Sequence, residues 1–105
     1  MQVLLVSLDK LFRKALAREC RGVGQPVRCV ESDDGMGAMF STALDRMDLI
    51  LLDAALVRHH GPAWLTNWRR MTPQGDVLVL DAASDATYLQ VREAVARIRE
   101  RLASA

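Results

Sequence analysis

Three aspartates stand where the strands of a parallel sheet would end. Asp53 directly follows the unbroken apolar run 49–52, Asp81 follows the similar run 77–80, and Asp9 comes shortly after an apolar run near the N-terminus. Runs of this length are typical of strands that are covered on both faces. Open α/β sheets place their functional crevice at the carboxyl ends of strands, so the three carboxylates could meet there and bind a divalent cation. The alternative for Asp53 is a solvated aspartate that ends a strand at a turn.

Other arrangements of chemically active residues are weak. His59 and His60 are adjacent, so they point apart and cannot both serve one metal ion without a third ligand. The sequence contains no glycine-rich phosphate loop, nucleophile elbow or metal-spaced set of His and Cys. These observations disfavour a small α/β enzyme or nucleotide binder, and we expect no enzymatic activity. Cys20 and Cys29 fall at positions that we expect to be buried, where free thiols in a reducing cytosol are favoured over a disulfide.

Size and composition indicate one soluble domain. The 105 residues, half of them apolar, are enough for a hydrophobic core without metal or disulfide, so we expect one domain over residues 1–105. The formal net charge of +1 favours neither nucleic acid nor an anionic membrane. No apolar run approaches the length of a membrane span, and the N-terminus enters a strand without a signal peptide. We therefore expect a cytoplasmic protein.

Hydrophobic spacing predicts alternating strands and helices. Helices are expected after Asp9, over about 35–47, from Pro62 onwards and over about 86–102, with a loop over 54–61. Strands are expected at 3–7, 27–30, 49–52 and 77–80. The first helix should bury Leu11, the third Met71 and the last Leu102. Right-handed crossovers then give a parallel sheet with helices on both faces.

The chain resembles the receiver domain of bacterial two-component response regulators over residues 2–85. The segment V-S-L-D-K-L-F-R keeps the frame of the family's first strand and helix, with matches at Val6, Asp9, Leu11 and Arg13. Asp53 stands in the place of the phosphorylated aspartate. Leu56 and Val57 replace its usual Met-Pro, and Gly61 is the matching glycine. The resemblance implies a flavodoxin-like, three-layer α/β/α fold with strand order 2-1-3-4 and the fifth strand missing.

The departures from the family pattern lie in the residues that would support phosphoryl transfer. The family holds a Mg²⁺ with an acid pair, but Ser7 and Leu8 occupy that place, and leucine cannot ligate a hard cation. Asp81, followed by Ala82, replaces a hydroxyl, and it would repel a phosphoryl oxygen at about 4 Å by roughly 4 kcal/mol at an effective dielectric of 20. The family lysine follows a fifth strand for which the chain has no candidate.

We therefore expect a degenerate receiver that works as a signalling module through protein contacts, independently of phosphorylation. The degenerate acidic pocket comprises Ser7, Leu8, Asp9, Asp81 and Ala82. We expect no cofactor, and Mg²⁺ binding by Asp9, Asp53 and Asp81 is disfavoured. The alternative is a working receiver of a phosphorelay, with phosphorylation at Asp53.

The missing fifth strand would leave the fourth strand at an edge of the sheet. Its apolar residues are Val77, Leu78, Val79 and Leu80, with neither charge nor proline among them. Such an edge is a template for strand pairing, so we expect a homodimer through these edges, through the last helix, or both. The alternative is that the last helix covers the edge. That helix could correspond to the family's fourth helix, its fifth, or a fusion of the two. Its arginines are interrupted by Glu93 and Glu100, which disfavours direct nucleic-acid binding.

Overall fold

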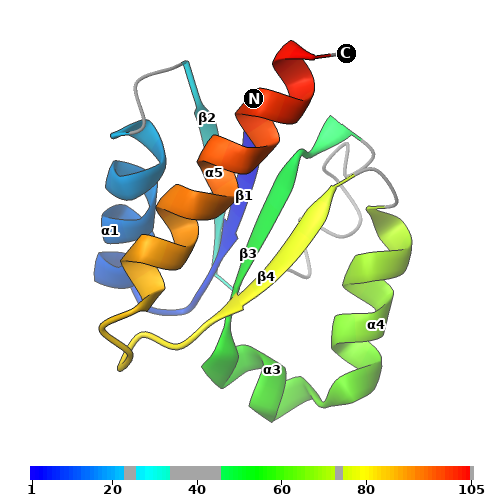
Figure 1. Cartoon of the computed structure of the whole chain (residues 1–105). Coiled ribbons are helices and arrows are strands. Elements are labelled where there is room, and N and C mark those ends of the chain that lie inside the picture. Colours follow the sequence, from blue (N-terminus) through cyan, green and yellow to red (C-terminus); the bar gives the residue numbers. More distant parts are fainter. Residues whose placement is uncertain (23–25, 34–45, 73–74, 105) are drawn as a thin grey trace.

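The computed structural model describes residues 1–22, 26–33, 46–72 and 75–104. Within these residues four parallel strands form one sheet in the order β2-β1-β3-β4 (Figure 1). The strands are β1 (Gln2–Val6), β2 (Arg28–Ser32), β3 (Leu49–Asp53) and β4 (Asp76–Leu80). The predicted strand order is confirmed, and the described residues contain no fifth strand. β2 and β4 are therefore the two edges of the sheet.

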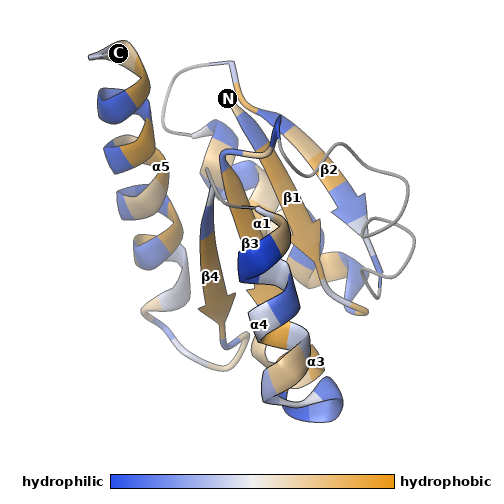
Figure 2. Cartoon of the chain, turned by 90° about the vertical axis from the view of Figure 1, so that its right-hand side faces the viewer, coloured by the Kyte–Doolittle hydropathy of each residue, from blue (hydrophilic) through white to orange (hydrophobic). Residues whose placement is uncertain are grey.

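The central strands are apolar because both faces of the sheet are covered. Side chains alternate between faces along a strand, so Val3 and Leu5 join one core cluster while Leu4 and Val6 join the other. Figure 2 shows β1 and β3 almost wholly hydrophobic, whereas α5 alternates between hydrophobic and hydrophilic residues.

One face of the sheet is covered by α1 (Lys10–Arg21) and α5 (Thr87–Ala103). Leu16 and Cys20 of α1 and Val95 and Ile98 of α5 belong to the same buried cluster. The two helices lie side by side (Figure 1), and Arg92 of α5 pairs with Glu19 of α1 at 3.3 Å. The last helix thus shares the face of the first helix rather than lying along the β4 edge.

The other face is covered by α3 (Ala54–His60) and α4 (Pro62–Met71). Trp64 and Trp68 are buried there against Leu52 and Ile50. Pro62 begins α4, as predicted. The expected helix over 35–47 falls mostly on residues 34–45, which lie outside the described residues.

The loop prediction for 54–61 is wrong for most of its length. Residues 54–60 form α3, because the Asp53 side chain caps the helix by accepting the backbone N–H of Ala55, and Leu56 is buried against the sheet. Gly61, at φ 90° and ψ 176°, then separates α3 from α4. A helix of seven residues spans only about two turns, so its few apolar residues do not give a helical spacing that can be recognised in the sequence.

Three residues predicted to be buried on helices are exposed. Leu11 is 81% exposed, Leu102 is 46% exposed, and Met71 is exposed as well. Met71 and Leu102 stand in the last turns of their helices, beyond the last buried residue of each stripe. Leu11 instead lies on the side of α1 opposite Phe12, Leu16 and Cys20, because successive residues of a helix are rotated by about 100°. No helix within the described ranges is both long enough and apolar enough to cross a membrane.

Candidate functional site at the carboxyl edge of the sheet

Asp53 ends β3 with both carboxylate oxygens hydrogen-bonded inside the chain. Its Oδ2 accepts the Ser7 hydroxyl at 2.6 Å, and its Oδ1 accepts the Ala55 backbone N–H at 2.9 Å. The residue is only 8% exposed. A hydrogen bond from a hydroxyl to a carboxylate is short and charge-assisted, so it holds the carboxylate in one orientation. Asp53 thus ends β3, caps α3 through its Oδ1 and is hydrogen-bonded through its Oδ2 to Ser7, the residue that follows β1.

Ser7 follows β1 and connects three segments. Its hydroxyl donates to Asp53 and accepts the backbone N–H of Asp9 at 3.0 Å. Its own N–H donates to the Ser32 carbonyl of β2 at 3.1 Å, and its carbonyl accepts the Arg13 guanidinium. The residue is fully buried. A side chain with both a donor and an acceptor is needed here, which a carboxylate could not supply in its ionised form.

Arg13 and Glu31 form the adjoining wall of the site. Arg13 Nε lies 3.2 Å from Glu31 Oε1, and Lys14 Nζ lies 2.9 Å from Glu31 Oε2. The hydrogen bond from Lys14 and then that from Arg13 lower the pKa of Glu31. These pairs join α1 to the edge strand β2. The sequence frame matches Arg13 to the family, but nothing in the sequence identified Glu31 as its partner.

Leu8 and Asp9 follow Ser7 and lead into α1. Asp9 caps α1 as predicted, with Oδ1 accepting the N–H groups of Leu11 at 3.0 Å and Phe12 at 3.1 Å. Leu8 is 67% exposed. The position of the family's second acid therefore presents an apolar side chain to solvent.

Asp81 follows the register partner of Asp53, and its hydrogen bonds are local. Leu80 is the register partner of Asp53, so Asp81 lies one residue beyond it along β4. Asp81 Oδ1 accepts the N–H of Ala83 at 2.9 Å, and its carbonyl accepts the Thr87 hydroxyl at the start of α5. Asp81 and Ala82 are both exposed.

The three aspartates each close a different turn rather than converge. Asp9 caps α1, Asp53 caps α3, and Asp81 bonds within the turn before α5. In the described part of the chain, no group of three or more His, Cys, Asp or Glu side chains lies close enough to hold a metal ion. Cation binding by Asp9, Asp53 and Asp81 therefore stays a prediction, because the three carboxylates do not form a ready ligand cluster.

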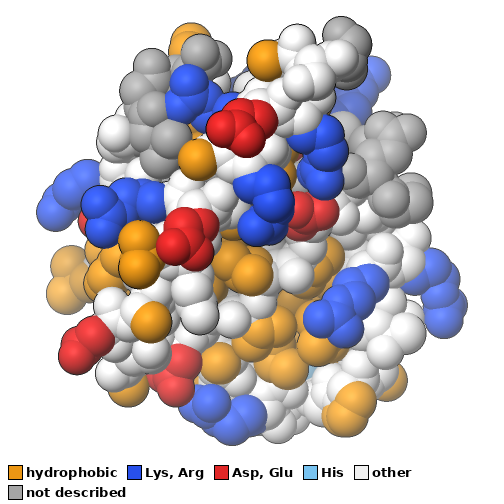
Figure 3. All heavy atoms as spheres, in the orientation of Figure 1, with side chains coloured by type: hydrophobic (Ala, Val, Ile, Leu, Met, Phe, Trp, Pro, Cys, Tyr) orange, Lys and Arg blue, Asp and Glu red, His pale blue; other side chains and the backbone are white. Residues whose placement is uncertain are grey.

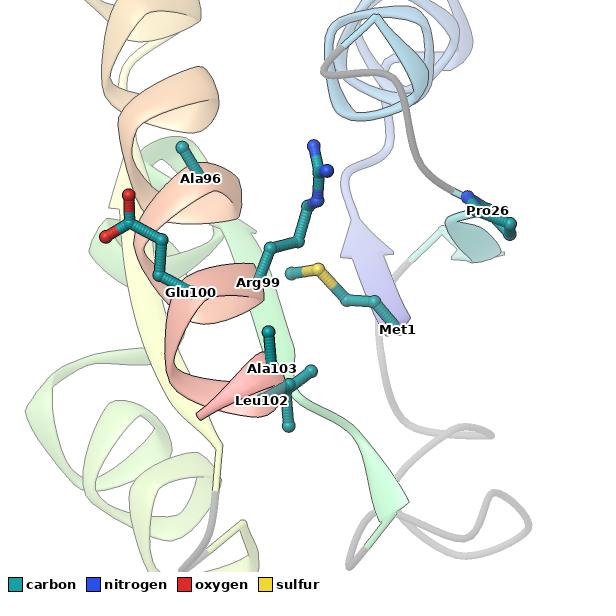
Figure 4. Close-up of a pocket in the computed structure, with 7 residues that line it drawn as sticks. All are labelled: Met1, Pro26, Ala96, Arg99, Glu100, Leu102 and Ala103. Carbon is teal, nitrogen blue, oxygen red and sulfur yellow. The ribbon is translucent and has the colours of Figure 1, made fainter. Parts of the chain in front are cut away.

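A pocket of about 520 Å³ lies at the amino-terminal ends of the strands, opposite the end that carries Asp53 (Figure 4). Met1 precedes β1 and Pro26 precedes β2, so the pocket is at the amino ends of the strands, away from Asp53. Its lining residues are Met1, Pro26, Ala96, Arg99, Glu100, Leu102 and Ala103. On the face that carries α1 and α5, basic and acidic side chains are interspersed (Figure 3), which gives this face no single-sign charge field.

Comparison with solved structures identifies the fold. A putative pilus assembly protein (cpaE) from Burkholderia thailandensis matches with a TM-score of 0.64 and 20% identity, covering 100% of this chain and 99% of that chain. A response regulator from Burkholderia pseudomallei, solved with a phosphorylated aspartic acid, calcium ion and citrate, matches with a TM-score of 0.57 and 24% identity. That match covers 89% of this chain and 54% of the other. A flavodoxin-like domain from Synechococcus matches with a TM-score of 0.52 and 14% identity, with full coverage of both chains.

No protein-family model matches the chain, and no curated protein matches it in sequence. The structural likenesses define a flavodoxin-like α/β fold of the kind found in response-regulator receivers, as the sequence predicts.

Proposed function

We propose that the chain is a degenerate receiver that acts in signalling through protein contacts and does not depend on phosphorylation of Asp53. The observation that supports this most is the state of the Asp53 carboxylate. Both of its oxygens are hydrogen-bonded within the chain and the residue is nearly buried. An incoming phosphoryl group would have to displace the Ser7 hydroxyl or the cap of α3.

The surroundings of Asp53 also lack the charge that phosphoryl transfer needs. The transferred group carries negative charge on its equatorial oxygens, and catalysis depends on neutralising it. Ser7 and Leu8 stand where the family has acids that hold the metal, and Asp81 adds a negative charge one residue beyond the register partner of Asp53. We accordingly propose no enzymatic turnover and no bound Mg²⁺. The phosphorylated aspartic acid in the similar response regulator supports the alternative, phosphorylation at Asp53.

Phosphorylation is tested with acetyl phosphate and Mg²⁺, followed by intact-mass measurement. A conventional receiver domain treated in parallel is the positive control, and Asp53→Asn is the matched variant. We expect the conventional receiver to gain a phosphoryl group while this chain does not. A gain in this chain that is abolished in Asp53→Asn would overturn the proposal and establish the phospho-acceptor alternative.

We further propose that the protein partner is a second copy bound through the β4 edge. β4 pairs with β3 on one side, and among the described residues no strand pairs with its other side. α5 lies on the α1 face of the sheet. Val79 is partly buried and packs in neither core cluster of the described residues. Two β4 edges related by a twofold axis would pair antiparallel and join two sheets of four strands into one, which removes both apolar edges from water.

The dimer is tested by sedimentation velocity at micromolar concentrations with three substitutions of one kind. Val79→Lys places a charge on the β4 edge, Leu89→Lys changes exposed apolar surface on α5, and Leu11→Lys does so on α1. We expect Val79→Lys alone to shift the protein to monomer, with unchanged far-ultraviolet circular dichroism. Dissociation by Leu89→Lys alone would assign the interface to α5. A monomeric wild-type protein would overturn the dimer but not the proposal for Asp53.

A further inference from the structure

The two cysteines of the chain form a contact between α1 and the edge strand β2. Cys20 is the residue before the last of α1, and Cys29 is the second residue of β2, beside Val3 of β1 in the register. Both pack against the same buried cluster. The Cys29 sulfur lies within hydrogen-bonding reach of the Cys20 thiol, and both cysteines are free.

The two thiols differ in exposure and in acidity. Cys20 is completely buried, whereas Cys29 is partly exposed on a strand with one neighbour. The hydrogen bond to Cys29 and burial both raise the pKa of Cys20. The hydrogen bond from Cys20 lowers the pKa of Cys29 to about 7, with a further contribution from Arg21 and with burial and Glu31 acting against it. Cys29 is therefore the thiol of the pair that loses its proton first, while Cys20 keeps its own.

An accessible thiolate beside a protonated thiol is the arrangement of a two-step oxidation site. We propose that Cys29 and Cys20 form a reversible modification site in which Cys29 reacts with a hydroperoxide and Cys20 then closes a disulfide. The proposal depends on the contact between the two side chains and on their unequal exposure. It is independent of the state of Asp53 and of the dimer.

The chemistry balances with hydrogen peroxide as the oxidant. The Cys29 thiolate attacks one peroxide oxygen, the O–O bond breaks, and the leaving hydroxide takes a proton, giving a sulfenic acid on Cys29 and one water. The Cys20 thiol then gives up its proton as its sulfur attacks the Cys29 sulfur. The S–S bond forms, the S–O bond of the sulfenic acid breaks, and the leaving hydroxide takes that proton to give the second water. The two thiols lose two protons and two electrons, which reduce one peroxide to two waters. A dithiol reductant reverses the change.

The disulfide would join the last turn of α1 to β2, and Glu31 of β2 also pairs with Arg13 and Lys14 of α1. In solution, the free-thiol alternative predicts two thiols that persist in the presence of peroxide.

The direct test treats the reduced wild-type chain with hydrogen peroxide, unfolds it in a maleimide reagent and measures its intact mass. We expect both thiols to be lost together, with the mass of two hydrogens missing, in a monomeric species that a reductant restores. Retention of both thiols under conditions that fully oxidise free glutathione in parallel would overturn the proposal. So would a disulfide that joins two chains instead of closing within one.

Two variants assign the order of the steps. In Cys20→Ala the reaction should stop at the Cys29 sulfenic acid, which a dimedone probe labels, whereas Cys29→Ser should show no labelling of the buried Cys20. The reverse pattern would overturn the assigned order.

Alkylation of Cys29 by iodoacetamide should show a midpoint near pH 7 in the wild-type chain, moving upward in Cys20→Ala. Among the described residues, the charged or titratable groups that act on Cys29 are Cys20 and Arg21 from α1 and Glu31 from β2. An unchanged midpoint would show that the Cys20 hydrogen bond does not activate Cys29. The wild-type mass measurement keeps the test valid if a variant fails to fold.

Discussion

At the scale of single residues, Ser7 changes what Asp53 can do. In the receiver pattern this place belongs to an acid that holds a cation, and here a hydroxyl donates to Asp53 and accepts from Asp9. Asp53 thereby becomes part of the framework that holds β1, β3 and α3 together.

We predict that Ser7→Ala lowers the free energy of unfolding by about 1 to 3 kcal/mol, because it leaves one buried Asp53 oxygen and the Asp9 N–H without their partner. Urea denaturation measures the loss, and the exposed Leu8→Ala serves as the control. In an Asp53→Ala background the Ser7 substitution should cost less, since its main partner is already gone. Equal costs in the two backgrounds would show that the Ser7–Asp53 hydrogen bond contributes nothing.

At the scale of elements, the connection from β3 to β4 holds two short helices separated by Gly61. Its φ of 90° with ψ of 176° is a backbone conformation that is essentially restricted to glycine. The turn lets Leu56 and Trp64 both reach the same face of the sheet.

We predict that Gly61→Ala destabilises the fold by about 1 to 3 kcal/mol through backbone strain alone, because an added Cβ would meet nothing within 4 Å. Gly22→Ala is the matched control, since Gly22 is already in the right-handed helical region and its added Cβ would make ordinary contacts. That change should be neutral or stabilising by up to about 1 kcal/mol. Thermal denaturation of both variants checks the contrast, and equal effects would contradict it.

The link between α1 and β2 should depend on pH. Because Lys14 and Arg13 lower the pKa of Glu31 below its ordinary value of 4.5, the ionised form is favoured in the folded state. The resulting stabilisation is present above pH 4.5 and is lost as the pH falls through the lowered pKa. We predict that Glu31→Gln lowers the urea midpoint at neutral pH but makes little difference well below pH 4.5. The exposed Glu93→Gln is the control, and a deficit that persists undiminished in acid would refute the assignment.

At the scale of the whole molecule, the last helix closes the core on the α1 face. Val91, Val95 and Ile98 are fully buried against the sheet and α1, while Arg97 and Arg101 pair with Asp76 at the start of β4 at 3.5 and 3.6 Å. α5 therefore covers a face of the sheet and does not pair with the edge of β4, which has no second strand partner among the described residues.

We predict that Ile98→Ala destabilises the protein by about 2 to 5 kcal/mol, because it removes buried contacts and leaves a cavity. Leu102→Ala, one turn later and 46% exposed, should change the unfolding free energy by only about 0.5 kcal/mol. Chemical denaturation measures both. Similar losses at the two positions would mean that α5 is not packed as described.

Residue pattern by itself indicated the four strands, the capping role of Asp9 and the place of Asp53 at a strand end, because each depends on residue type and spacing within a few positions. The strand order and the departures at Ser7, Leu8 and Asp81 followed from the resemblance to receiver domains. The tertiary structure decided which face α5 covers, the bond between Ser7 and Asp53 across 46 residues and the contact between Cys20 and Cys29. It also showed that α3 forms where a loop was expected. These features depend on strand register and on how helices pack on the sheet, and such long-range pairings exist only once the sheet has assembled.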